Sequence, residues 1–246
     1  SGFLPYAREI EDMELIRTLG VDGAGETGVA ITASGGTSQE ETEVVSGEAG
    51  TISAAVLELQ GEGSSYLYFG HVTQLLLGEE LARRGVMPSL DYVLRDVEMR
   101  LETALYVVRN GTAGQAIEAA ADDGSATDRL EALADDAGLT ANSMPRTVKD
   151  VLAELDRQGA SFLPAVLADD GLTAAGYGIL KDGALVGWAE GDAALGVNLI
   201  FGKVDADVVE VQAPDGTAAA LRVVGAAASV RPIWQGDTLA GLKVHC

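Results

Sequence analysis

The sequence predicts an α+β protein: a mixed helix and antiparallel-sheet N-terminal domain, followed by a smaller, hairpin-rich domain. Two observations carry this prediction. Apolar residues at helical spacing occur mainly before residue 160, and short strand-like apolar runs separated by turns follow it. Hydrophobic residues make up 47% of the 246 residues and aromatic residues only 5%. We therefore expect a buried core built mainly of Val, Leu, Ile and Ala.

The first part opens with a hairpin and then becomes largely helical. Strands are expected over 13–21 and 28–34, joined by the turn signal of residues 22–25. Cap residues and periodicity predict the other elements of this part. Helices are expected over 51–59 and 79–84, from Ser89, after Thr112, over 128–137 and over 147–158. Strands are expected over 66–69 and 72–77, or as one bent strand across both, and over 104–108.

The second part has hairpin character. Strands are expected over 162–167, 174–180, 184–189, 208–211, 219–224 and 239–244, and Asp182-Gly183 is a favoured two-residue hairpin turn. Because the pattern changes after an Ala-, Asp- and Gly-rich stretch, we divide the chain into an N-terminal α+β domain, residues 1–145, and a β-rich domain, residues 146–246.

The charge of the chain excludes one class of partner. Asp and Glu number 38 and Lys and Arg 16, so the formal net charge is −22. Such a surface repels phosphate backbones and anionic lipid, so we expect no nucleic-acid partner. We interpret the acidity as a solubility feature or an adaptation to habitat. No apolar run reaches the roughly 18 residues of a membrane helix.

Two glycine patterns resemble nucleotide-binding motifs in residue type and spacing but not in their expected secondary structure. Gly23, Gly25 and Gly28 have dinucleotide-fingerprint spacing, but a strand-like segment follows where that fingerprint needs a helix. Residues 196–203 resemble a phosphate loop with one residue too many, and Val204 replaces the Ser or Thr that would hold magnesium. We predict a hairpin turn at the first and a strand and turn at the second, and no cofactor.

No catalytic or metal centre is expected. The chain has one cysteine, Cys246, and two histidines, and it lacks the nucleophile elbow of a serine hydrolase. His71 with Glu79 and Glu80 is the strongest candidate for a metal or acid–base site. We instead expect His71 to hydrogen-bond to the backbone or to a carboxylate, and the two glutamates to favour a helix start.

Charged side chains at i,i+4 spacing are expected to pair along the helices. These pairs are Glu79–Arg83, Glu80–Arg84, Asp91–Arg95 and Asp96–Arg100. We interpret eight residues as a structural or partner-docking motif: His71, Glu79, Glu80, Arg83, Arg95, Asp96, Glu98 and Arg100.

The same region resembles a known family. The pattern comprises Gly50-Thr51-Ile52, Gly70-His71, Gly78-Glu79-Glu80, Ala82-Arg83, Gly85, Leu90-Asp91, Arg95-Asp96, Glu98 and Arg100. Supporting segments are 8–12, 20–22, 181–188 and 202–203. Together they resemble the Ger(x)C family, the C-subunit lipoproteins of spore germinant receptors, in its N-terminal and middle domains.

The resemblance implies a lipid-anchored protein on the outer face of the spore inner membrane. It implies membrane-embedded A and B receptor subunits as partners, a role in nutrient-triggered germination, and no catalysis. The sequence departs from the family in lacking the lipid-bearing N-terminal cysteine, and the family's C-terminal domain is largely missing. We expect any membrane link to be a lipid upstream of Ser1.

Function is thus expected to reside in protein–protein contacts. One alternative is a small-molecule module of a secreted lipoprotein that itself binds a nutrient, which would require a pocket with a few convergent polar groups. Another is a secreted hydrolase that uses paired carboxylates. The germinant, the contacting surface and the oligomeric state stay open.

Overall fold

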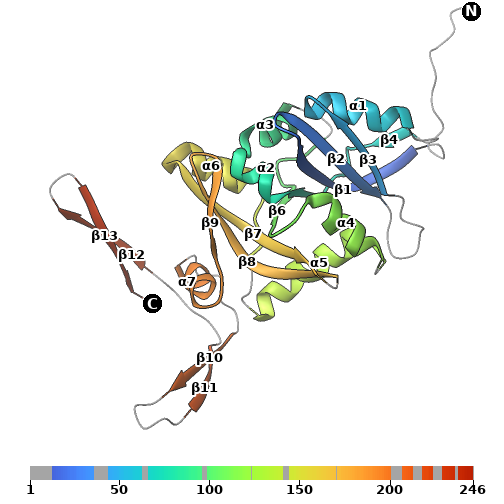
Figure 1. The fold of residues 1–246 in the computed structure, drawn as a ribbon. Coiled ribbons are helices and arrows are strands. Elements are labelled where there is room, and N and C mark those ends of the chain that lie inside the picture. Colours follow the sequence, from blue (N-terminus) through green and yellow to red (C-terminus); the bar gives the residue numbers. More distant parts are fainter. Residues whose placement is uncertain are drawn as a thin grey trace, which may run out of the picture.

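A nine-stranded mixed sheet forms the centre of the molecule (Figure 1). The computed structural model describes residues 13–35, 44–62, 66–95, 99–122, 124–140, 144–169, 171–200, 207–212, 218–223, 229–235 and 238–245. The strand order is β3-β2-β1-β5-β6-β7-β8-β9, and β4 pairs with the start of β1. The predicted α+β class is confirmed.

The strands of this sheet are β1 (Met13–Ala24), β2 (Gly28–Gly35), β3 (Val44–Ala49), β4 (Tyr66–Tyr68), β5 (Gln74–Leu77), β6 (Ala104–Val108), β7 (Ala160–Ala168), β8 (Leu172–Lys181) and β9 (Ala184–Ala189). The helices are α1 (Ile52–Glu62), α2 (Glu79–Arg84), α3 (Met87–Arg95), α4 (Ala113–Asp122), α5 (Ala126–Thr140), α6 (Val148–Gln158) and α7 (Asp192–Ile200). Two further hairpins follow, β10 (Asp207–Gln212) with β11 (Ala218–Val223) and β12 (Ser229–Gln235) with β13 (Thr238–His245).

The sheet is antiparallel at its two sides and parallel in its centre. Both predicted hairpins are present, but the β1–β2 turn lies at residues 25–27 and not at 22–25, because β1 continues through Ala24. In the β8–β9 turn, Asp182 and Gly183 have positive φ, as a tight hairpin turn requires. Strands β1, β5, β6 and β7 are parallel neighbours, which the sequence analysis did not anticipate. All four residues of β5 are buried, because central parallel strands are covered on both faces. The sequence signal for this arrangement is the uninterrupted run of three leucines in β5.

Helices cover both faces of the sheet and enclose a core on each. On one face Leu75 and Leu77 of β5 pack in a core with residues of α1, α2, α3 and α6. On the other face Leu76 packs with Ile117 of α4 and Leu130 of α5. Successive strand residues point to opposite faces, so one run of three leucines joins the two layers.

Two predicted capping boxes are present. At α6, Thr147 and Asp150 exchange side-chain and backbone hydrogen bonds, and Gly159 ends the helix in the left-handed conformation. At α4, Thr112 and Gln115 do the same. Helix α3 begins at Met87, so Ser89 lies within its first turn and is not its cap.

The prediction of a strand over 196–203 is wrong, because α7 covers residues 192–200. This helix packs Ala194 against the β7–β8 surface, and Asn198 accepts a hydrogen bond from the buried hydroxyl of Tyr177. Such long-range contacts override the local preference of this Gly- and Val-containing segment for a strand. Strands β3 and β12 were not predicted.

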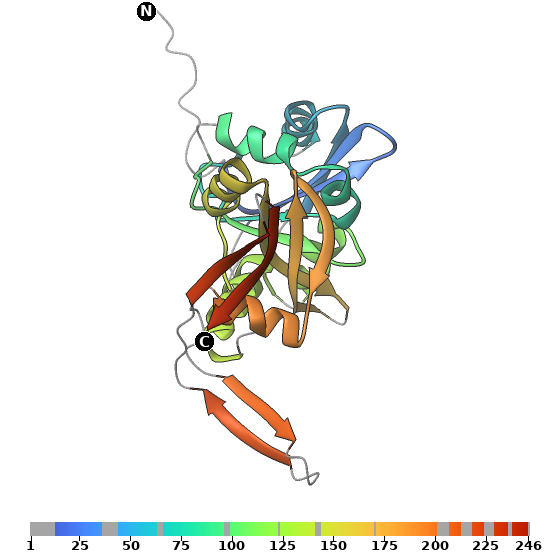
Figure 2. The ribbon, with the colours of Figure 1, turned by 90° about the vertical axis from the view of Figure 1, so that its left-hand side faces the viewer.

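The predicted division between residues 145 and 146 stays a prediction. Strand β6 lies before this position and pairs with β7, which lies after it, through Val107–Ala165 and Val108–Val166. The hairpins β10–β11 and β12–β13 form two-stranded sheets of their own. The hairpin β10–β11 lies clear of the main sheet in both ribbon views, whereas β12–β13 lies apart from it in Figure 1 and in front of it in Figure 2.

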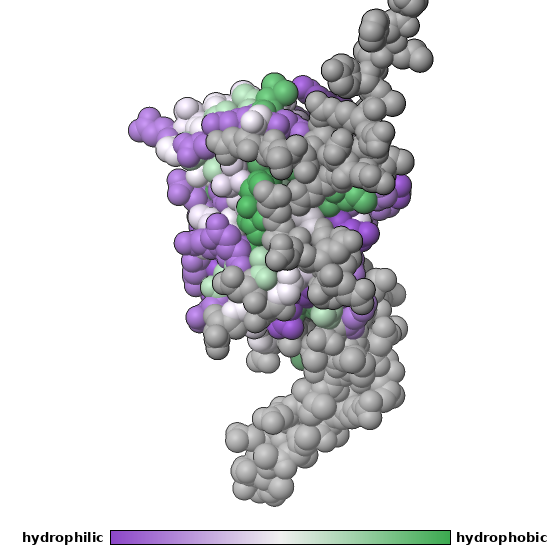
Figure 3. Space-filling view, turned by 90° about the vertical axis from the view of Figure 1, so that its right-hand side faces the viewer, coloured by the Kyte–Doolittle hydropathy of each residue, from purple (hydrophilic) through white to green (hydrophobic). Residues whose placement is uncertain are grey.

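Within the described residues, no helix combines the length and apolarity needed to cross a bilayer. On the face drawn in Figure 3, hydrophobic residues appear in small groups among hydrophilic ones. Scattered apolar residues of this kind are normal on a protein surface and need no special explanation.

Candidate functional site at the carboxyl ends of the parallel strands

Polar residues gather where the parallel strands β1, β5 and β6 end. Asp22, near the end of β1, is buried, and its two carboxylate oxygens accept hydrogen bonds from the backbone N–H groups of Ala113 (2.7 Å) and Gly114 (2.9 Å). These N–H groups start α4 and have no partner within the helix. Burial raises the pKa of Asp22, and the two hydrogen bonds offset part of that effect. Asp22 therefore joins the sheet to α4.

Gly78 makes room for this carboxylate. A Cβ atom at position 78 would lie 1.9 Å from Oδ1 of Asp22, although the backbone there has an ordinary extended conformation. The glycine at the start of α2 is thus required by a neighbour and not by a turn.

Glu79 joins α2 to the turn after β6. Its carboxylate accepts hydrogen bonds from the backbone N–H of Asn110 (2.6 Å) and from Nε of Arg83 (2.8 Å). Burial alone would raise the pKa of Glu79, but the hydrogen bonds from Asn110 and Arg83 and the charges of Arg83 and Arg109 outweigh it and hold that pKa below its usual value. The predicted Glu79–Arg83 pair is therefore present.

The predicted pairs Glu80–Arg84 and Asp91–Arg95 do not form among the described residues. The guanidinium of Arg84 instead donates to the carbonyl oxygens of Gly25 (3.0 Å) and Glu26 (2.8 Å) in the β1–β2 turn. The hairpin turn holds two carbonyl acceptors in place for the guanidinium. An ion pair with the exposed carboxylate of Glu80 would contribute little stability, so the carbonyl contacts are preferred. Arg84 therefore fixes α2 to that turn.

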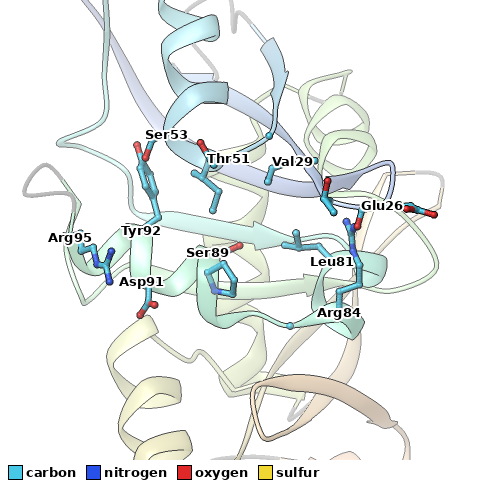
Figure 4. A pocket seen from close by; sticks show the side chains of 16 residues that line it. Glu26, Val29, Thr51, Ser53, Leu81, Arg84, Ser89, Asp91, Tyr92 and Arg95 are labelled. Atoms are coloured by element: carbon cyan, nitrogen blue, oxygen red, sulfur yellow. The ribbon is translucent and has the colours of Figure 1, made fainter.

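A pocket of about 840 Å³ opens beside this cluster, between the start of α1, the β1–β2 turn and helices α2 and α3 (Figure 4). Its lining includes Val29, Leu81 and Pro88 as apolar groups, and Thr51, Ser53, Ser89 and Tyr92 as polar groups. Six lining residues belong to the sequence pattern described above: Gly50, Thr51, Ile52, Gly85, Asp91 and Arg95.

The motif residues expected to act in structure or docking occupy different environments. His71 is exposed and packs edge to face against Tyr68, at 5.7 Å between ring centroids, and makes no hydrogen bond within the described part of the chain. Glu80, Arg95 and Arg100 are exposed. Asp96 and Glu98 lie outside the described residues. The structure thus brings Glu79 and Arg83 together and leaves His71 apart from both.

The described residues hold no cluster of three or more His, Cys, Asp or Glu side chains that could bind a metal ion. Beyond the carboxyl ends of β6 and β9, Arg109 forms an ion pair with Glu190, and its guanidinium lies over the ring of Trp188. The absence of a metal or a cofactor stays a prediction.

Sequence reasoning missed Asp22 and Ser89. Asp22 directly follows a strand-like run and was assigned to the hairpin turn, so its burial was not apparent. An acidic residue between apolar strand residues, 56 positions before Gly78, gives no local signal of the contact. Only the pairing of β1 with β5 brings the two together.

Comparison with known proteins identifies the family. The model of the family described as spore germination protein N-terminal domain matches residues 6–167. The chain belongs to this family. The match covers most of the main sheet and includes Asp22, Gly78, Glu79 and the whole pocket lining, and it confirms the Ger(x)C resemblance.

A solved structure supports the same fold. The crystal structure of the GerBC protein matches with a TM-score of 0.53 and 17% sequence identity, over 89% of this chain and 66% of that one. The present chain therefore matches about two-thirds of the length of that structure. The search of curated proteins gave no match.

Proposed function

We propose that this chain is a non-enzymatic, extracytoplasmic subunit of a spore germinant receptor that contributes to nutrient-triggered germination through protein–protein contacts. The observation that carries the proposal is the family match over residues 6–167. The partners proposed are the membrane-embedded A and B subunits. The location proposed is the outer face of the spore inner membrane, reached through a lipid outside this sequence.

The arrangement of the motif residues supports a role in contact. Asp22 and Glu79 accept hydrogen bonds that fix the fold where the parallel strands end, and Gly78 leaves room for the Asp22 carboxylate. Arg95 and Arg100 are exposed, and neither forms an ion pair within the described part of the chain. Exposed arginines are well suited to interfaces, because a guanidinium offers several donors in a rigid geometry. We propose that Arg95 and Arg100 contact a partner subunit.

The test is affinity purification of the tagged protein from detergent-solubilised spore membranes. We expect both membrane subunits to co-purify with the wild-type protein. The double variant Arg95→Glu, Arg100→Glu should lose them and slow germination while its melting temperature stays unchanged. A matched control is Arg157→Glu, on the exposed side of α6. Recovery of no membrane subunit with the wild-type protein would contradict the proposal.

A further inference from the structure

The turn between β6 and α4 presents an exposed asparagine that is followed by a glycine. Asn110 has a φ of 56°, in the left-handed region that asparagine adopts more readily than most residues. Its side chain is exposed, and the side-chain amide forms no hydrogen bond with a described residue. The carbon of this amide is therefore open to attack by a nearby nucleophile.

Gly111 supplies such a nucleophile. Its backbone N–H donates no hydrogen bond within the described part of the chain, although its carbonyl oxygen accepts one from the N–H of Glu79 (3.2 Å). Because glycine has no Cβ, nothing on residue 111 crowds the side chain before it. Attack by the nitrogen of Gly111 on Cγ of Asn110 closes a five-membered ring. The two reacting groups thus lie in one turn, and neither is held by another bond.

The other candidates lack this combination. Asn198 is buried, its side-chain oxygen accepts a hydrogen bond from Tyr177, and Leu199 follows it. Asn142 lies outside the described residues. Asp182 shares the positive φ and has a glycine after it, but an ionised carboxylate is a much poorer electrophile than an amide. Among the described residues, Asn110 is therefore the one set up for ring closure.

Glu79 holds the backbone on both sides of the reacting bond. Its carboxylate accepts the N–H of Asn110 (2.6 Å), and its own N–H donates to the carbonyl of Gly111 (3.2 Å). The rotation about ψ of Asn110 that closes the ring lies between these two anchors. Glu79 therefore restrains the reaction, and any change of the chain between Asn110 and Gly111 disturbs the link between α2 and this turn.

We propose that Asn110 is a deamidation site and that its conversion releases the link between α2 and the turn after β6. The nitrogen of Gly111 gives its proton to water and forms a bond to Cγ of Asn110. The C–N bond of the side-chain amide breaks, and ammonia leaves after taking a proton from water. A second water then opens the cyclic imide at either carbonyl, which leaves an aspartyl or an isoaspartyl residue at position 110.

Both products weaken the bonds of Glu79. Each adds a carboxylate beside the carboxylate of Glu79, and two like charges repel. The isoaspartyl product also adds a methylene to the backbone before Gly111, which moves the Gly111 carbonyl away from the Glu79 N–H. We expect the converted protein to melt at a lower temperature than the fresh protein. The reaction does not depend on the receptor role proposed above, because it needs only this chain and water.

The test is incubation of the full chain at mildly alkaline pH in H₂¹⁸O, followed by peptide mass spectrometry that separates aspartate from isoaspartate. We expect ¹⁸O to enter position 110 well before position 198, and isoaspartate to form, since direct hydrolysis of the amide yields aspartate alone. Gly111→Ala should slow conversion several-fold, because a Cβ hinders ring closure. The nearest atom to that Cβ is Oε1 of Gln115 at 3.3 Å, the end of a flexible side chain, so the fold is kept.

Glu79→Ala should speed conversion, because both turn residues lose their side-chain anchor. Glu80→Ala is the matched control on the same helix turn and should leave the rate unchanged, since Glu80 is exposed and pairs with no described residue. Thermal melting shows that each variant is folded. Three results would each overturn the proposal: aspartate without isoaspartate, equal rates for the wild type and Gly111→Ala, or a folded chain that stays unconverted while the urea-unfolded chain converts fully.

Discussion

Among single residues, Gly78 shows how a side chain far away in the sequence can determine which residue type a position accepts. Asp22 fills the space where a Cβ at position 78 would lie. The backbone conformation of Gly78 is one that any residue adopts, so a larger side chain would be excluded by contact alone. This makes the contact directly testable, since relief should follow when Asp22 is shortened.

We expect Gly78→Ala to lower the free energy of unfolding by about 1–3 kcal/mol, the usual cost of overpacking. In an Asp22→Ala background the same substitution should cost clearly less, because the clashing carboxylate is gone. Chemical denaturation of the four proteins of this cycle measures the coupling. Gly187→Ala, where a Cβ would meet no atom within 4 Å, should change stability by no more than about 0.5 kcal/mol. Strict additivity of the two substitutions would refute the steric argument.

The lowered pKa of Glu79 predicts a specific dependence of the free energy of unfolding on pH. Its pKa is lower in the folded protein than its usual value, so its contribution is present at neutral pH and is lost as the pH falls through that usual value and then through the folded pKa. Glu79→Gln should therefore cost about 1 kcal/mol at pH 7 and progressively less at acidic pH.

Unfolding of Glu79→Gln in urea across this pH range provides the measurement. Glu80→Gln is the matched control on the same helix turn, because Glu80 is exposed and forms no ion pair with a described residue. A stability deficit of Glu79→Gln that stays constant from neutral to acidic pH would show that the carboxylate charge is not responsible.

Among the elements, α6 carries a buried carboxylate, Glu154, that pairs with Arg146 just before the helix and accepts a hydrogen bond from β7. Arg146 and Glu154 approach to 2.5 Å with side chains 8% and 12% exposed, and Ser161 of β7 donates to the same carboxylate (2.7 Å). The guanidinium also lies 4.2 Å from the ring centroid of Phe162. The sequence analysis identified the cap of α6 but gave no sign of this ion pair.

Glu154→Ala should destabilise the protein by about 3–5 kcal/mol, because it removes the carboxylate that faces a buried guanidinium. Arg83→Ala, which breaks the more exposed pair with Glu79 on α2, should cost no more than about 1 kcal/mol. Thermal and denaturant unfolding compare the two. Similar small losses for both variants would mean that the Arg146–Glu154 pair behaves as a surface contact.

For the whole molecule, the position of a domain boundary can be decided by truncation. The main sheet runs across residue 145 through the β6–β7 pairing and ends with β9, before the two hairpins. We expect a fragment of residues 1–200 to unfold cooperatively. Fragments 1–145 and 146–246 expressed separately should not, because each would expose strand edges and core surface.

Circular dichroism melting of the three fragments checks this expectation. Limited proteolysis of the intact chain is a second measurement, in which cuts after residue 200 should precede cuts near 142–160. Two cooperatively melting fragments divided at residue 145 would confirm the boundary that the sequence predicts and contradict the expectation from the sheet.

The sequence alone determined the features that depend on neighbouring residues. Turn residues predicted the β1–β2 and β8–β9 hairpins, and capping pairs predicted the starts of α4 and α6. The spacing of charges predicted the Glu79–Arg83 pair. All of these involve residues within a few positions of each other, so local patterns contain the information.

The tertiary structure decided what depends on distant segments. The parallel pairing of β1, β5, β6 and β7 brings Asp22 to α4 and beside Gly78, although 56 positions separate the two residues. Arg84 bonds to a hairpin turn instead of its helical neighbour, and Ser89 becomes a pocket residue instead of a helix cap. Burial and the hydrogen bonds it requires are properties of the packed sheet and helices, so no local pattern of residues contains them.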